Sequence, residues 1–327
     1  MIAIPAIRIQ RIVLIIAVLI FSIKIFAWSV TKSNAILTDA LESIVNIVAG
    51  AFSLYSLYLS SKPKDKDHPY GHGKIEFISA SIEGILIAIA GLTMIIKSLI
   101  DLGNPYKVLQ IDLGLILISI SALLNYVLGS WMIAEGKKGN TYPLIAGGKH
   151  LQIDAYTSVG LLIGLFLIQV TGYYNLDAYI AIVLGLLIVV SGSKIIRSSI
   201  GGIMDETDIA LMSTILEILR KNRKDVWIDL HNVRAIRYGN KYHVDAHITL
   251  PWYYSLQAAH DEIQVIEKLI EENLRTPTEV FLHMDPCIDE SCSICPLDLC
   301  EVRKKIFVKR QVWTLDNIMM NRKHQLD

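Results

Sequence analysis

The chain has 327 residues, of which 31 are basic and 31 acidic, so its formal net charge is zero and does not indicate a nucleic-acid-binding protein. Hydrophobic residues make up 53% of the chain and charged residues only 19%, below the roughly 25% of a soluble domain. This composition does not fit an ordinary soluble protein and favours a membrane protein.

Six apolar stretches reach the roughly 20 residues that a helix needs to cross a lipid bilayer. The first follows Arg8 and Arg11, but it is too long for a signal peptide and no small-residue cleavage site follows it. After Asp205 charged residues become dense, and no later stretch is apolar enough to span a membrane. The sequence therefore predicts an α-helical membrane domain over 1–204 with six transmembrane helices. The six stretches are 10–30, 34–60, 75–101, 109–134, 148–170 and 177–199.

The basic residues are distributed unevenly between the two sides of the predicted membrane domain. One side has most of them, whereas the connections on the other side hold only Lys32 and Lys107. Because basic connections stay on the cytoplasmic side, we expect both termini in the cytoplasm and a multi-pass protein of the cell (inner) membrane. The residues on the basic side are Arg8, Arg11, Lys62, Lys64, Lys66, Lys74, Lys137, Lys138, Lys149, Lys194 and Arg197.

The part of the chain over 205–286 has the pattern of a small mixed α/β domain. Amphipathic spacing predicts two helices, and alternation of apolar and polar residues predicts three strands. The order helix, strand, strand, helix, strand indicates an open sheet with helices on one face. The helices are expected over 209–221 and 256–274, and the strands over 226–238, 241–250 and 279–283.

Polar residues recur on one face of two predicted transmembrane helices. Asp39, Glu42 and Asn46 are spaced by three and four residues in the second stretch, and His150 and Asp154 are four apart in the fifth. Charged groups in the middle of a bilayer cost about 2.5–3.5 kcal/mol each on insertion scales, so they are rare and usually functional. We expect these side chains to lie close together inside the bundle.

Imidazole nitrogen and carboxylate oxygen are standard ligands of Zn²⁺, so this cluster predicts an intramembrane metal site. Histidine titrates near neutral pH, which would allow protons to replace the ion. The alternative is a set of hydrogen bonds that only holds the helices together. Glu83, Asn125 and Lys24 are isolated polar residues in other helices, and we assign them structural roles.

The connection over 64–76, which reads KDKDHPYGHGKIE, concentrates candidate metal ligands at the end of the second helix. Asp65, His68 and His72 lie within eight residues of one another. Such a loop can bind metal at the mouth of a pathway, or it can be a solvated turn.

Three motifs are similar to those of the cation diffusion facilitator family. They are HPYGHGKIE after the second helix, KHLQIDAYTSVG in the fifth, and MDE at 204–206. The resemblance extends to about Cys287 and follows the family in order and spacing. It implies six transmembrane helices, a cytoplasmic ferredoxin-like domain, a homodimer, and exchange of metal for protons by alternating access.

The resemblance also implies a four-residue transport site made of Glu42, Asn46, His150 and Asp154. The second pair matches the zinc-type pattern of the family. The first pair departs from it, because Asn46 stands where the family usually has Asp and Glu42 where it has His or Asp. A neutral amide is the weaker ligand, so Asp39 is a further candidate in this site.

The same resemblance assigns three further groups of residues. Asp65, His68 and His72 match an interfacial metal site, while Lys74 and Asp205 match a charge interlock at the junction of the two domains. A dimer-bridging metal site in the second domain is implied by His231, His247, His260, His283 and Asp285.

The segment 287–327 is expected as a separate Cys-rich tail. Its cysteines are spaced C-x4-C-x2-C-x4-C, and in a reducing compartment four thiols so close together fit a small zinc or other soft-metal site. The alternative is a reduced, partly disordered tail. The basic segment after Val302 contains Trp313, which is expected against the dimer or the membrane surface. The cysteines are Cys287, Cys292, Cys295 and Cys300.

These observations predict a divalent-metal exporter, most simply one that exchanges zinc for protons. The first alternative keeps the architecture and changes the cargo to Fe²⁺, Mn²⁺, Co²⁺ or Cd²⁺. A membrane-embedded metalloprotease would need an H-E-x-x-H helix, which the sequence lacks, so we do not expect an enzyme. A membrane-anchored metal sensor would not need polar groups at matched depth in two helices.

Overall fold

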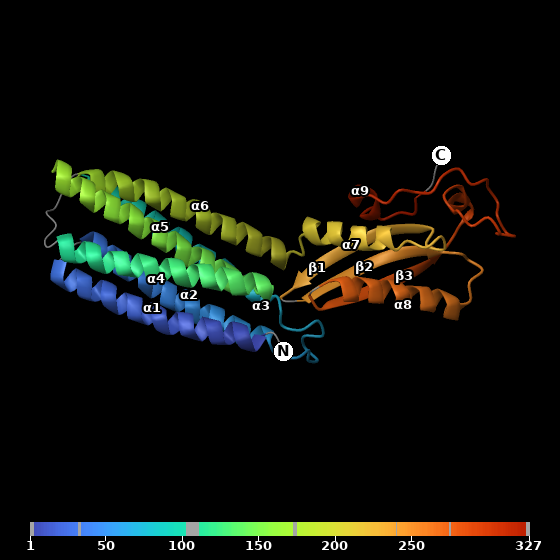
Figure 1. Cartoon of the computed structure of the whole chain (residues 1–327), viewed down its shortest axis with the longest axis horizontal. Coiled ribbons are helices and arrows are strands. Elements are labelled where there is room, and N and C mark those ends of the chain that lie inside the picture. Colours follow the sequence, from blue (N-terminus) through green and yellow to red (C-terminus); the bar gives the residue numbers. More distant parts are fainter. Residues whose placement is uncertain are drawn as a thin grey trace. The chain divides into compact units, whose positions relative to one another are not determined.

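The computed structural model describes residues 3–31, 34–102, 111–172, 175–239, 241–274 and 276–324. It divides into two compact units, Met1–Met204 and Asp205–Asp327. Figure 1 shows the long helices of the first unit side by side and the small sheet of the second. The helices of the first unit are α1 (Ala3–Thr31), α2 (Asn34–Ser60), α3 (Ile75–Asp101), α4 (Ile111–Lys138), α5 (Tyr142–Thr171) and α6 (Asn175–Ile203).

Five of these helices are long and apolar enough over their described residues to cross a membrane. The exception is α5, whose 30 residues include His150 and Asp154. Both side chains are turned inward and buried, and α5 packs against α2, α3, α4 and α6. A polar helix can lie in a bilayer when its polar groups face the bundle in this way. The five candidate spans are Ala6–Val30, Ser43–Ser60, Ile75–Ile100, Leu115–Lys138 and Ile182–Ile203.

Large apolar side chains cover the outside of the first unit. They are exposed on each of its six helices, which would drive aggregation in water but suits contact with lipid. These residues, together with the spans, make the first unit a helical membrane domain as the sequence predicts. Examples, one from each helix, are Ile15, Phe52, Ile89, Leu123, Phe166 and Leu187.

Glycines bring the helices of two pairs into close backbone contact. A Cβ placed on Gly192 of α6 would lie 2.8 Å from the backbone oxygen of Gly84 on α3. A Cβ on Gly148 of α5 would likewise lie 2.7 Å from the backbone oxygen of Gly129 on α4. Small residues are what allow helices to pack tightly in lipid, where the hydrophobic effect does not pull them together.

The second unit contains the predicted α-β-β-α-β order. Strands β1 (Asp229–Tyr238) and β2 (Lys241–Leu250) are antiparallel, and β3 (Thr278–Pro286) pairs with β2 in parallel. Helices α7 (Ile209–Lys221) and α8 (Leu256–Asn273) share one apolar core with the sheet. Asp208 and Ser255 begin these helices, each accepting a hydrogen bond from the backbone N–H three residues on.

A bulge in β1 between His231 and Arg234 shifts the alternation of its side chains. Asn232 adopts a φ of 51° there, and Leu230 and Val233 consequently both point into the core. The backbone N–H of Asn232 donates to the carbonyl of Met320, 2.8 Å away, in the segment that follows α9 (Leu315–Ile318). The C-terminal segment therefore packs along this edge strand.

The segment 287–327 is not a separate tail, because its described residues belong to the same compact unit as the sheet. Trp313 is 1% exposed and lies in the core with Ile318. Arg223 stacks on its ring at 3.7 Å, and Arg220 donates a hydrogen bond to its carbonyl. The expectation that Trp313 lies on an outer surface is therefore wrong, since a bulky indole gains more in this apolar core. A short 3-10 helix, η1 (Asp289–Ser293), lies near the start of the segment 287–327.

Candidate functional site

The predicted polar cluster of the membrane domain is centred on three side chains. Asn46 of α2 lies between His150 and Asp154 of α5: its Nδ2 donates to Oδ2 of Asp154 at 2.5 Å, and its Oδ1 is 2.5 Å from Nε2 of His150. Nδ1 of His150 is 3.5 Å from Oδ1 of Asp154. His150 and Asp154 are 3% and 2% exposed, whereas Asn46 is half-buried.

The amide of Asn46 sets the protonation pattern of this cluster. Its oxygen carries no hydrogen, so Nε2 of His150 must be the donor in their contact. Asn46 therefore bridges the ring and the carboxylate when no ion lies between them. A metal would need a deprotonated ring nitrogen and the carboxylate, and it would replace the bridge that Asn46 makes.

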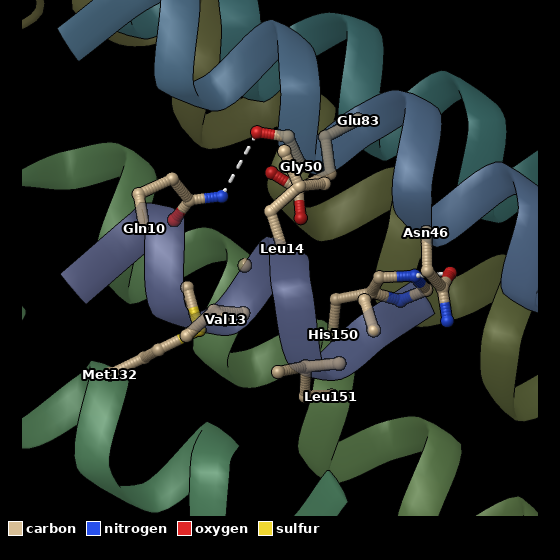
Figure 2. Close-up of a pocket in the computed structure, with 11 residues that line it drawn as sticks. Gln10, Val13, Leu14, Asn46, Gly50, Glu83, Met132, His150 and Leu151 are labelled. Carbon is tan, nitrogen blue, oxygen red and sulfur yellow. Dashed lines mark hydrogen bonds between the residues drawn. The ribbon is translucent and has the colours of Figure 1, made fainter. Parts of the chain in front are cut away.

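The side chains of Asp39 and Glu42 lie outside the described residues, although both belong to α2. Figure 2 shows the pocket that adjoins the cluster, with His150 and Asn46 on one side. Its volume is about 30 Å³, and Gln10 of α1 and Glu83 of α3 also line it.

The loop after α2 brings Asp65, His68 and His72 together. Oδ1 of Asp65 accepts hydrogen bonds from the backbone N–H of His68 at 2.7 Å and contacts its Nδ1 at 3.0 Å. Its Oδ2 is 3.2 Å from Nε2 of His72. The loop turns at Gly71, whose φ of 95° is easily adopted only by glycine. One donor atom from each residue lies within 4.8 Å of the others, close enough to hold one ion.

The electrostatics of this loop favour a charged carboxylate. Partial desolvation acts to raise the pKa of Asp65, but the hydrogen bonds from His68 outweigh it, and the pKa lies below its ordinary value. A ligand that stays ionised is suited to binding a cation at neutral pH.

The second unit contains a third cluster on the sheet. His231 of β1 and His247 of β2 are directly paired across the strands, and Asp285 is the next-to-last residue of β3. Oδ2 of Asp285 lies 3.3 Å from Nε2 of His231 and 3.0 Å from Nδ1 of His247. Donor atoms of these three residues lie within 4.8 Å of one another. This cluster and the one in the loop after α2 are the two groups of this kind among the described residues.

The two remaining residues predicted for this cluster differ in position. His283 is next to it, with its ring 4.7 Å from that of His247 and its Nε2 3.8 Å from Oδ1 of Asp285. His260 lies on α8, where its Nε2 is 3.2 Å from Nε2 of Gln264, and it does not join the group.

Sequence reasoning missed two residues that support the sheet cluster. Asp229 is 1% exposed, with Oδ2 3.5 Å from Nδ1 of His231 and Oδ1 2.6 Å from Nδ1 of His324. Burial acts to raise the pKa of Asp229, but these hydrogen bonds outweigh it and hold the pKa well below its ordinary range. The pattern Asp229-x-His231 on a strand was the available signal, because it places both side chains on one face.

The four cysteines are free thiols in one short loop. Arg303 ties this loop together by donating to the carbonyls of Cys292, Cys295 and Leu297 at 2.7–3.0 Å. Sγ of Cys287 accepts a hydrogen bond from the backbone N–H of Trp252 at 3.4 Å. Burial raises the pKa of the Cys287 and Cys295 thiols. The thiols are not among the described groups whose donor atoms all lie within 4.8 Å.

Comparison with known proteins decides the family. Residues 11–204 match the model of the cation efflux transmembrane domain, and residues 210–287 match that of the cation efflux protein cytoplasmic domain. The chain belongs to the cation diffusion facilitator family. Members of this family are transporters of divalent cations and not enzymes.

Similar members of the cation diffusion facilitator family come from several organisms. An uncharacterized transporter of Synechocystis is 30% identical over 82% of this chain and 86% of its own length. The manganese efflux system protein MneP of Bacillus subtilis is 27% identical over 86% of this chain and 97% of its own. The cation-efflux pump FieF of Yersinia pestis is 26% identical over 83% and 89%.

In this cation diffusion facilitator, the described residues form two polar clusters in the membrane domain, one around Asn46 and one in the loop after α2, and one on the sheet of the cytoplasmic domain. Lys74, one member of the predicted interlock, has its Nζ 3.4 Å from the carbonyl of Ile203 at the end of α6. Asp205, the other member, has a φ of 58° at the start of the second unit.

Proposed function

We propose that this transporter exports Zn²⁺ from the cytoplasm in exchange for protons, by alternating access. The observation that carries the proposal is the buried contact of Asn46 with both His150 and Asp154 inside the helix bundle. An imidazole and a carboxylate four residues apart on one helix form a standard pair of zinc ligands. Zinc would replace the amide bridge between them.

The proposed transport cycle begins at the cytoplasmic loop. Metal enters past Asp65, His68 and His72 and moves to His150 and Asp154, with Asn46, Glu42 or Asp39 as further ligands. The bundle then opens to the other side, and protons entering there neutralise the carboxylate and charge the imidazole. The protonated groups no longer hold the ion, so it leaves.

A second candidate cargo is Mn²⁺ or Fe²⁺, and the observation that favours it is Asn46. Its amide carbonyl adds an oxygen donor and no nitrogen or sulfur donor to the site, and manganese prefers oxygen ligands. MneP, similar to this chain, is named for manganese efflux. Co²⁺ and Cd²⁺ would use the same pathway. A membrane-anchored metal sensor is less well supported, because it has no use for buried polar groups in α2 and α5.

We further propose a homodimer in the cell (inner) membrane with both termini in the cytoplasm. The excess of Lys and Arg on one side supports this orientation, and the match to the family's cytoplasmic domain supports it too. In this dimer, His231, His247 and Asp285 would hold a structural Zn²⁺ or other divalent ion, with His283 beside them. His260 and the pair Lys74 and Asp205 are proposed to contribute across the dimer.

The cysteine loop is proposed as a separate structural zinc site. Four soft sulfur donors held in one loop by Arg303 fit the chemistry of Zn²⁺, and a bound metal would offset the raised pKa of the buried thiols. Elemental analysis of the purified protein should find one zinc less per chain in Cys292→Ser/Cys295→Ser than in the wild type. Equal zinc contents would contradict the site.

Transport is tested with purified protein in proteoliposomes, using Zn²⁺, Mn²⁺, Fe²⁺, Co²⁺ and Cd²⁺ with and without a pH gradient. We expect Zn²⁺ uptake that the gradient accelerates and that Asp154→Ala reduces at least tenfold. Ser158→Ala, one turn further along α5 and equally buried, is the control and should keep most of the uptake. Wild-type uptake by Asp154→Ala would refute the site, and uptake of Mn²⁺ alone would select the second candidate.

A further inference from the structure

Glu83 is a carboxylate of the membrane domain that the proposed transport cycle does not use. It lies on α3 and is only 4% exposed, and among the described residues its Oε2 has no hydrogen-bond partner. Its isolation in the sequence favoured a structural role. However, a structural carboxylate inside a helix bundle needs hydrogen bonds or a partner charge, because burial without them is costly.

The position of Glu83 joins it to the transport cluster. It lines the same pocket as His150 and Asn46, although the three residues come from three different helices. Figure 2 labels Glu83, Gln10, Asn46 and His150 among the residues that line this pocket. The pocket volume of about 30 Å³ exceeds the roughly 10–15 Å³ that a cavity needs to hold one water molecule, so it can admit a single ion.

The Glu83 carboxylate lies next to Gly147 of α5. A Cβ at Gly147 would lie 3.4 Å from Oε1 of Glu83 and 3.1 Å from Cε of Met132. Gly147 is three residues before His150, so the two positions share one face of the helix. The same turn of α5 therefore presents the imidazole and contacts the Glu83 carboxylate, and all three residues line the pocket.

The low negative charge of the cluster indicates how the Glu83 carboxylate could contribute to cation binding. Of the three side chains of Asn46, His150 and Asp154, only Asp154 carries a negative charge, because Asn46 is a neutral amide. A divalent ion held by one carboxylate would keep excess positive charge in a medium of low dielectric constant. We propose that Glu83 is a further ligand of the transported divalent cation and supplies from α3 the negative charge that Asn46 lacks. This inference rests on the proposed metal transport and names another residue of its site.

The test compares Glu83→Gln with a matched buried acid on the same face of α3. Glu76 is seven residues earlier, is 3% exposed and accepts a hydrogen bond from Ser60 at 2.8 Å. In proteoliposomes, we expect Glu83→Gln to raise the half-saturating metal concentration at least tenfold and Glu76→Gln to change it less than twofold. Adding Asn46→Asp to Glu83→Gln returns a carboxylate to the site and should recover most of the affinity.

Gel filtration and thermal unfolding establish that the variants compared are folded. If Glu83→Gln does not fold, Glu83→Asp, which keeps the charge on a shorter side chain, is used with the same controls and should weaken uptake three- to tenfold. The role of Glu83 would be overturned if the Glu83 variant had the half-saturating metal concentration of the wild type or if the Glu76 control lost as much affinity. It would also be overturned if Asn46→Asp recovered no affinity. A wild-type protein that takes up none of the metals would instead overturn the proposed function.

Discussion

Some single side chains in this transporter make contacts that their spacing in the sequence does not predict. Asn46 was the member of the predicted site that departed from the family pattern, and the structure places it in contact with both His150 and Asp154. Its amide has a donor and an acceptor, so it can bridge a ring nitrogen and a carboxylate as no carboxylate could. Asp229 has a similar place beneath His231 in the cytoplasmic domain.

The first prediction concerns Asp229, which orients His231 and also binds His324. Replacing Asp229 by Asn should lower the metal affinity of the sheet cluster by about 10–100-fold, because residues that orient a ligand tune its binding. Isothermal titration of the purified protein measures this loss. Asp225→Asn is the control, since Asp225 is mostly exposed and pairs only with Arg310 among the described contacts. Unchanged affinity in Asp229→Asn would contradict the role.

The positions of the helices and strands depend mainly on local sequence, whereas their contacts depend on packing. Apolar length and periodicity located the six membrane helices and the α-β-β-α-β elements, but not η1 and α9, and α5 begins at Tyr142, six residues before the predicted 148. Its first turn contains Pro143, which needs no hydrogen-bond partner at a helix start. Glycines then decide how closely α3 and α6 approach, and no hydrophobicity pattern reports such a contact.

The second prediction concerns the α3 and α6 contact. Gly192→Ala should destabilise the membrane domain by about 1–3 kcal/mol, because the new Cβ would meet backbone atoms of Gly84 and Ala88 at 2.8 Å. Thermal unfolding in detergent measures the change. Gly50→Ala is the control, where the nearest atom is a flexible Leu14 methyl at 3.3 Å and little loss is expected. Equal melting temperatures for Gly192→Ala and the wild type would contradict the idea that the close contact of α3 and α6 stabilises the membrane domain.

The third prediction compares two tryptophans of the cytoplasmic domain. Trp313→Ala should lower the free energy of unfolding by about 3–5 kcal/mol, because Trp313 is 1% exposed in the core. Trp252 is 56% exposed, so Trp252→Ala should have little effect. Chemical denaturation of the isolated domain, followed by circular dichroism, separates the two. A small loss in Trp313→Ala would mean that the C-terminal segment contributes little to the core.

The whole molecule consists of two units with separate cores. The apolar cluster of the second unit draws on α7, α8, the sheet, Trp313 and Ile318, without any residue of the membrane helices. A domain with its own core can fold alone. The C-terminal segment belongs to that core, so the natural boundary of the second unit differs from the 205–286 domain that the sequence predicted.

The fourth prediction follows from this organisation. Residues 205–327 expressed alone should unfold in one cooperative transition, whereas residues 205–286 should be less stable because they lack Trp313 and Ile318. Thermal scans followed by circular dichroism compare the two fragments. The idea fails if the longer fragment shows no transition or if the shorter one is equally stable.

The sequence alone determined the membrane helices, the α-β-β-α-β order and which candidate ligands lie close along one element, because these depend on local composition and on spacing within one element. His150 and Asp154 could be paired in this way, as could Asp65 with His72, since each pair is close along the chain. Tertiary structure decided the rest, because it depends on contacts between distant elements. Only packing brings Glu83 of α3 to the pocket of His150 and sets Asn46 between two residues of α5. Packing likewise buries Trp313 in a core whose first residues lie in α7, roughly a hundred residues earlier in the chain.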